Sequence, residues 1–232
     1  MANSMPAPLR TPVGSLDAGA RARFISRTYG HLFAAIAGFT AIEVFLFSTG
    51  MAETIADAML STNWLLILGG FMIVGYLASW GASRAQSPAA QYAALAAYVV
   101  AEAIIFVPLL YIADNIAPGA ISSAAVITLI GFAGLTAIAV SSGKDFSFLG
   151  VFLKWGGIVA LLLIVGSVIF GFQLGTFFSV AMVAFAGGAI LYSTSKILRT
   201  YPEDRYVGAA LELFAAVALM FWYVLRLTMS RD

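Results

Sequence analysis

Residues 207–229 form an almost unbroken apolar stretch whose only charged side chains are Glu212 and Arg226. As an α-helix this stretch would extend about 34 Å, which is enough to cross a bilayer with some tilt. The spacing of the two charges places them within roughly 40° of each other around the helix and about 21 Å apart along it. Even lenient insertion scales assign roughly 2.5 to 3.5 kcal/mol to a charge at mid-span, so we expect this face to look toward other helices and not toward lipid.

The composition is that of a membrane protein. Of the 232 residues, 62% are hydrophobic and 10% are charged, whereas soluble domains carry about 25% charged residues. The net charge of +1 gives no electrostatic basis for binding nucleic acid. The absence of cysteine and the single histidine, His31, exclude thiolate catalysis, a histidine metal cluster and a catalytic triad. We therefore expect neither an enzyme nor a cofactor, and metal ligands remain unassigned.

Six further apolar stretches precede the last one and predict an all-α membrane protein, a bundle of seven transmembrane helices. The polar residues 1–27 are interpreted as a cytoplasmic tail, followed by a single transmembrane domain, 28–232. The segment with Glu53 and Asp57 is interpreted as a loop between the first two spans. The predicted spans are residues 31–50, 63–82, 89–113, 120–140, 146–170, 176–197 and 207–229.

Lysine and arginine are divided unequally between the two predicted sides. Ten of the twelve lie in the N-terminal tail or in and beside the connections after the second, fourth and sixth spans, and only Arg226 and Arg231 lie on the other side. Cytoplasmic loops carry an excess of these residues, so this bias predicts a cytoplasmic N terminus and an external C terminus.

Three segments of the chain carry a family resemblance. They are GKDFSFLG at residues 143–150, ILY at residues 190–192, and YVGAAL at residues 206–211, which leads to YVLRL at residues 223–227. Together they resemble the Bax inhibitor-1 family, also called transmembrane Bax inhibitor motif or YccA-like proteins, over about residues 27–227. The resemblance implies a seven-helix bundle with the C-terminal helix enclosed by the other six. It also implies a pH-sensitive calcium leak, with Ca²⁺ as transported ion, and for prokaryotic members a place in the cytoplasmic (inner) membrane.

The chain departs from the family pattern at its proton switch. In that pattern, one aspartate at the cytoplasmic end of span six and another in span seven share a proton and set the pore according to pH. Ser193 and Ala216 stand at those positions here. Two carboxylates in one low-dielectric site titrate as a coupled pair, so the switch cannot be carried over without them. The two arginines of the pattern are matched by Arg226 and by Arg84.

Glu212 is the candidate substitute for the missing acids. It lies one turn on the cytoplasmic side of Ala216 on the same helix face, from which its carboxylate could reach the hydroxyl of Ser193. Alternatively, Glu212 reaches the cytoplasmic interface and pairs with Arg205 or Lys196.

Three other acids are candidates for an ion pathway. Glu102, deep in the third span, is either an ion site or a protonated side chain that hydrogen-bonds to a neighbouring helix. Glu43 either lines the outer half of a cation route with Asp114 or reaches toward the outer interface. The complete set of pathway or gate candidates is Glu212, Ser193, Arg226, Glu102, Arg84, Glu43 and Asp114.

Two functions follow from these observations. The first is a cation leak, calcium by resemblance, with altered proton gating. The second is a non-conducting regulator that binds membrane proteins such as a membrane-anchored ATP-dependent protease, as the resemblance implies for some bacterial relatives. The bilayer is the expected partner in both, and the oligomeric state is not set by the sequence.

Overall fold

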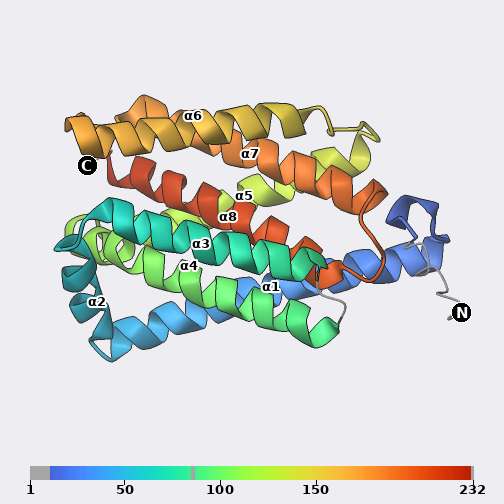
Figure 1. Cartoon of the computed structure of the whole chain (residues 1–232), viewed down its shortest axis with the longest axis horizontal. Helices are drawn as coiled ribbons and strands as arrows, with labels where there is room; N and C mark the ends of the chain where they lie inside the picture. The colour runs from blue at the N-terminus through green and yellow to red at the C-terminus, as the bar shows by residue number, and fades with distance from the viewer. Residues whose placement is uncertain (1–10, 85–86, 231–232) are drawn as a thin grey trace, which may run out of the picture.

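The computed structural model describes residues 11–84 and 87–230, which form an elongated helical bundle (Figure 1). Within these residues, a short turn η1 (Val13–Ser15) precedes eight α-helices. Seven of them are long and apolar enough to cross a membrane, which confirms the predicted fold class and number of spans. The helices are α1 (Ala18–Ser48), α2 (Met51–Leu60), α3 (Trp64–Arg84), α4 (Pro88–Ile116), α5 (Ala120–Ser141), α6 (Leu149–Phe170), α7 (Thr176–Arg199) and α8 (Tyr206–Met229).

Helix α1 begins at Ala18, well before the predicted start at His31, so part of the predicted tail 1–27 is helical. The side chain of Asp17 caps this helix, because its carboxylate accepts a hydrogen bond of 2.9 Å from the backbone N–H of Ala20. The alanines and arginines that follow Asp17 are good helix formers. Hydropathy missed these first turns of the helix because most of the residues that form them are polar or small.

The segment between the first two spans is a helix, α2, and not the predicted loop. Ala52 and Ala56, four residues apart, are buried on one face with Leu46 and Val107. Glu53 and Asp57 are on the exposed side. The helix lies crosswise at one end of the bundle (Figure 1), and its small buried face is too short to be recognised as a span.

Helix α8 is the interior helix of the bundle. In its apolar stretch 72% of the residues are buried, compared with 6% in α6. Helices α1, α3, α4, α5 and α7 all pack against it. Helix α6 packs mainly on α7 and adds Ala160 to a small cluster with Met182 and Tyr223. The C-terminal helix is therefore surrounded by five spans, and its enclosure by all six stays a prediction.

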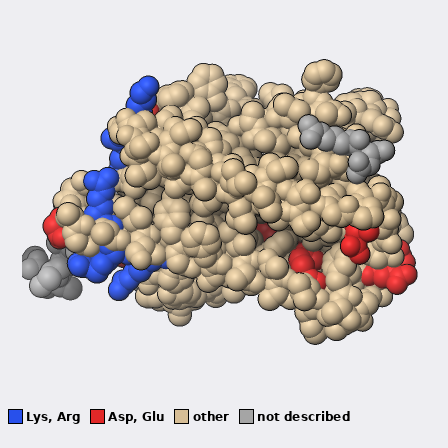
Figure 2. Space-filling model, turned by 180° about the vertical axis from the view of Figure 1, so that it is seen from behind, with Lys and Arg blue, Asp and Glu red and all other residues tan. Residues whose placement is uncertain are grey.

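Charged side chains gather at opposite ends of the bundle. Figure 2 shows the lysines and arginines of one face at one end and most of its acidic side chains toward the other. Helix α1 begins at the basic end and α8 finishes at the opposite one (Figure 1). This arrangement agrees with the ten-to-two division of basic residues in the sequence, while the side of the membrane that each end faces stays a prediction.

Candidate functional site

A cavity of about 900 Å³, here called the main cavity, lies between the α3–α4 pair and the α6–α7 pair and follows α8. Four predicted candidates line it, which are Glu102, Ser193, Glu212 and Arg226. Ala216, the second position at which the family pattern has an acid, also lines it. Both substituted positions therefore face the same space as Glu102 and Glu212.

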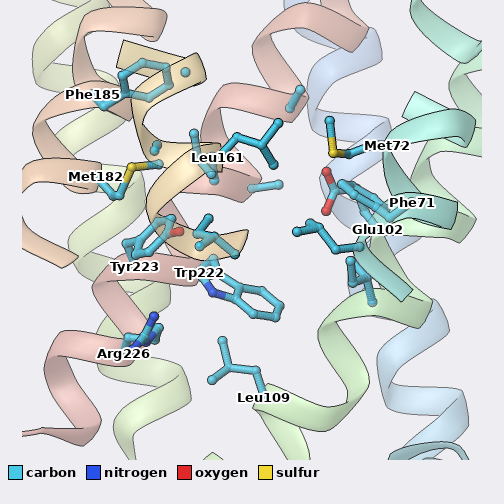
Figure 3. A pocket seen from close by; sticks show the side chains of 18 of the residues that line it. Phe71, Met72, Glu102, Leu109, Leu161, Met182, Phe185, Trp222, Tyr223 and Arg226 are labelled. Carbon is cyan, nitrogen blue, oxygen red and sulfur yellow. The ribbon is translucent and has the colours of Figure 1, made fainter. Parts of the chain in front are cut away.

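The walls of the main cavity are mostly apolar. Figure 3 shows Glu102 beside Phe71 and Met72 on one side, and Met182 and Tyr223 on the other. Glu102 is 5% exposed, and the hydroxyl of Tyr98, one turn earlier on α4, is the polar group that faces it. Because charges interact more strongly where few polar groups and little water surround them, a carboxylate here would dominate the local field.

Glu212 forms an ion pair with Lys196 at the basic end of the main cavity. The Nζ atom of Lys196 lies 2.9 Å from Oε1 and 3.1 Å from Oε2 of Glu212. Both side chains are partly exposed, at 35% for Lys196 and 31% for Glu212. Of the two cationic partners considered from the sequence, Lys196 forms this pair, whereas Arg205 donates to the carbonyl oxygen of Ala82 at 3.0 Å.

Tyr201 is the third member of the cluster that Lys196 and Glu212 form, and the sequence did not predict it. Its hydroxyl donates a 3.0 Å hydrogen bond to Oε1 of Glu212, and the ammonium of Lys196 lies 5.1 Å from the centre of its ring. Burial first, and the neighbouring Glu212 carboxylate second, raise the pKa of Tyr201 well above its ordinary value. The hydroxyl therefore stays protonated and remains a donor at physiological pH.

Backbone contacts hold Tyr201 in position. It lies in the connection between α7 and α8, and its carbonyl accepts a 2.9 Å hydrogen bond from the N–H of Val13. Val13 is fully buried. No sequence motif signals this contact, because it joins the segment before α1 to the α7–α8 connection, which is distant in the chain.

The serine at the first substituted position has no part in the hydrogen bonds that Glu212 makes with Lys196 and Tyr201. Ser193 is buried and lines the main cavity with Glu212. Glu212 and Ser193 thus line one cavity, but the hydrogen bonds of Glu212 go to Lys196 and Tyr201 and not to Ser193. The ion pair with Lys196 matches the alternative interpretation.

Arg226 lies at the far end of the main cavity. Its guanidinium donates a 3.2 Å hydrogen bond to the carbonyl of Leu174 and lies 6.0 Å from the centre of the Tyr223 ring. From Glu212 to Arg226, α8 advances by about 21 Å. Arg84 is the last residue of α3, and its side chain lies outside the part that the structure describes.

Glu43 and Asp114 belong to a second, smaller space. This outer cavity, of about 350 Å³, lies between α1, α4, α5 and α8. Glu43 is 7% exposed, and neither of its carboxylate oxygens has a hydrogen-bond partner among the described residues. Thr128, which sequence reasoning missed, lines the same cavity and has an unpartnered hydroxyl. The predicted candidates are thus divided between two cavities.

Residues 143–148 connect α5 to α6, and together with Gly150 in the first turn of α6 they lie against the end of α7. The side chain of Arg199 donates to the carbonyl of Gly143, and the N–H of Phe146 donates to Oγ of Ser195 at 3.2 Å. A Cβ atom at Gly150 would lie 2.9 Å from a ring carbon of Tyr192, so only glycine fits here without a shift. This segment, one of the three that carry the family resemblance, is therefore held against α7.

Two comparisons with known proteins bear on this fold and site. A sequence profile of the family described as inhibitor of apoptosis-promoting Bax1 matches residues 21–232. The chain is also 34% identical over 110 residues to an uncharacterized protein of Pseudomonas aeruginosa, PA2604, in an alignment that covers 46% of this chain and 48% of that protein. This alignment spans about half the length of that relative.

Proposed function

Because the chain belongs to the Bax inhibitor-1 family, we propose that it lets a cation, Ca²⁺ by resemblance, leak down its gradient through the main cavity. The observation that supports this most strongly is that one cavity contains Glu102 within it, Glu212 toward the basic end and Arg226 toward the other. A cation crossing the bilayer needs such carboxylates, since a charge in hydrocarbon alone is costly.

The ion pair of Lys196 and Glu212 acts as the closure in this proposal. While the ammonium neutralises the carboxylate, the basic end of the cavity offers a cation no free anionic ligand. Lys196 is partly exposed, so its long side chain can turn toward the aqueous interface and leave Glu212 available. The closure then depends on a salt bridge and not on a proton shared by two acids.

Glu102 has a separate role as the internal site. Its position on α4 faces the interior helix α8, across from the wall formed by α6 and α7. An ionised Glu102 would lower the barrier for a cation between the two ends of the cavity. A neutral amide at this position keeps the size and hydrogen-bonding capacity but removes that attraction.

Charge asymmetry supports an orientation with the Lys196–Glu212 end in the cytoplasm. The basic side chains gather at this end of the bundle (Figure 2), and such asymmetry orients membrane proteins with the basic end inside. We place the protein in the cytoplasmic membrane of a prokaryote, with its C terminus outside.

Calcium uptake into proteoliposomes loaded with a fluorescent indicator tests the proposal. The wild type should admit Ca²⁺ faster than protein-free vesicles, and Glu102→Gln should reduce the rate on the order of tenfold. Glu53→Gln is the matched control, because Glu53 is exposed on α2 and lines neither cavity. A wild-type rate equal to that of empty vesicles would contradict conduction and favour the non-conducting regulator.

A further inference from the structure

The outer cavity contains a buried acid that the proposed leak does not use. Glu43 lines this cavity and is only 7% exposed. Neither of its carboxylate oxygens has a hydrogen-bond partner among the described residues. Thr128, 2% exposed, presents a second unpartnered oxygen to the same space. Buried polar groups are normally hydrogen-bonded, so each exception requires an explanation.

The lining of the outer cavity decides which ligand would suit these groups. Apart from Glu43, Asp114 and two threonines, its walls are hydrocarbon. The hydroxyl of Thr40 already donates to the carbonyl of Ile36. Neither lysine nor arginine is among its lining residues. Five aromatic rings contribute to it, those of Phe39, Phe47, Phe106, Phe214 and Phe221.

An inorganic divalent cation fits this lining poorly. Ca²⁺ takes about six to eight oxygen ligands, whereas the cavity presents one deep carboxylate, a hydroxyl and the exposed Asp114. Among the described residues, no group of three or more acidic, histidine or cysteine side chains could hold a metal ion. The chemistry favours a ligand with a single positive group and an apolar body.

A protonated amine attached to a hydrocarbon body matches each of these features. Its ammonium would pair with Glu43 and donate to Thr128, and aromatic faces attract cations as well as apolar groups. A volume of about 350 Å³ lies within the range of small-molecule sites, roughly 300 to 1,000 Å³. We propose that the outer cavity, lined by Glu43, Thr128 and phenylalanine rings, binds a small hydrophobic organic ammonium ion.

The fold also provides a route into this site. Helices α1 and α5 both pack on α4 and α8, while extensive packing between α1 and α5 is absent from the described residues. Figure 2 shows acidic side chains set within a recess of the apolar surface, toward the acidic end. A hydrophobic amine that partitions into the bilayer would therefore reach Glu43 from the side or from the end where Asp114 lies.

Calorimetric titration with phenethylammonium tests this proposal. The protein is held in phosphatidylcholine nanodiscs, and the heat from empty nanodiscs is subtracted to remove partitioning into lipid. We expect saturable binding to the wild type and at least about tenfold weaker binding to Glu43→Gln. Glu53→Gln, altered outside both cavities, should bind as the wild type does.

Phenethyl alcohol and Ca²⁺ provide outcomes that do not depend on how well a variant folds. The alcohol has the same carbon skeleton without the charge and should bind the wild type at least about tenfold more weakly than the amine. Millimolar Ca²⁺ should leave amine binding unchanged. Equal affinity for amine and alcohol, loss of the amine on adding Ca²⁺, or absence of saturable binding would overturn the proposal.

Discussion

The ammonium group of Lys196 lies 2.9 Å and 3.1 Å from the two carboxylate oxygens of Glu212, and this ion pair joins the end of α7 to the beginning of α8. Glu212 lines the main cavity together with Ser193 and Ala216, the two positions where the family pattern has acids. The family pattern, by resemblance, has acids at positions 193 and 216, whereas this chain has an ion pair at the nearby positions 196 and 212. This difference changes which stimulus could open the basic end of the main cavity.

Restoring the two acids should introduce a pH dependence. In the double variant Ser193→Asp with Ala216→Asp, two carboxylates would share one low-dielectric cavity and titrate as a coupled pair. Calcium flux in proteoliposomes should then increase as the pH rises from about 5 to about 8, because loss of the shared proton adds negative charge. The matched control is Ser193→Asn with Ala216→Asn, which cannot ionise. Parallel pH profiles for the two double variants would contradict this explanation.

Removing the hydroxyl of Tyr201 should destabilise the fold near neutral pH. Tyr201→Phe leaves the ring but removes the hydrogen bond to Glu212, at a cost of about 1–2 kcal/mol in the free energy of unfolding. Burial and the Glu212 carboxylate raise the pKa of this hydroxyl. The stabilisation is therefore complete below the ordinary value of about 10 and is lost as the pH rises beyond it.

Denaturant unfolding in detergent measures this effect. At about pH 8 the wild type should be more stable than Tyr201→Phe, and the difference should shrink above about pH 10. Tyr76→Phe is the control, because the Tyr76 side chain is exposed on α3. If the difference in free energy of unfolding between the wild type and Tyr201→Phe grew above about pH 10, the protonated hydroxyl would not be the stabilising form.

Cysteine labelling should place the two ends of the bundle on opposite sides of the membrane. The chain has no native cysteine, so single-cysteine variants report without interference. Ser142→Cys lies after α5 at the basic end, and Ser230→Cys follows α8. In intact cells, a membrane-impermeant maleimide should label Ser230→Cys and should label Ser142→Cys only after lysis. The reverse pattern would invert the proposed orientation.

The spans could be predicted from sequence, but their neighbours could not. Hydropathy located α8 because its length and apolar content match the bilayer. It missed the start of α1, where Asp17 caps a largely polar helical segment, and α2, whose buried face depends on Leu46 and Val107 of other helices. Local periodicity describes one helix at a time, whereas these features depend on tertiary contacts.

The candidate site shows the same limit. Helix periodicity placed Glu212 and Arg226 on one face of α8, and both line the main cavity. Helix periodicity could not show that Glu43 and Asp114 line a different cavity from Glu212 and Arg226, because that division depends on how α1 and α5 pack around α8. Tyr201 was missed since its place opposite Glu212 is set by the connection that Val13 holds.

The rate of Ca²⁺ uptake by proteoliposomes that contain Lys196→Gln tests the central claim most directly. This variant removes the cation from the ion pair and leaves the Glu212 carboxylate as a free ligand at the basic end of the cavity. We expect uptake faster than the wild type on the order of tenfold, and return to the wild-type rate or below when Glu212→Gln is added. Lys144 is exposed in the connection between α5 and α6, so Lys144→Gln should take up Ca²⁺ at the wild-type rate. An unchanged or slower rate in Lys196→Gln would contradict the claim that this ion pair closes the main cavity.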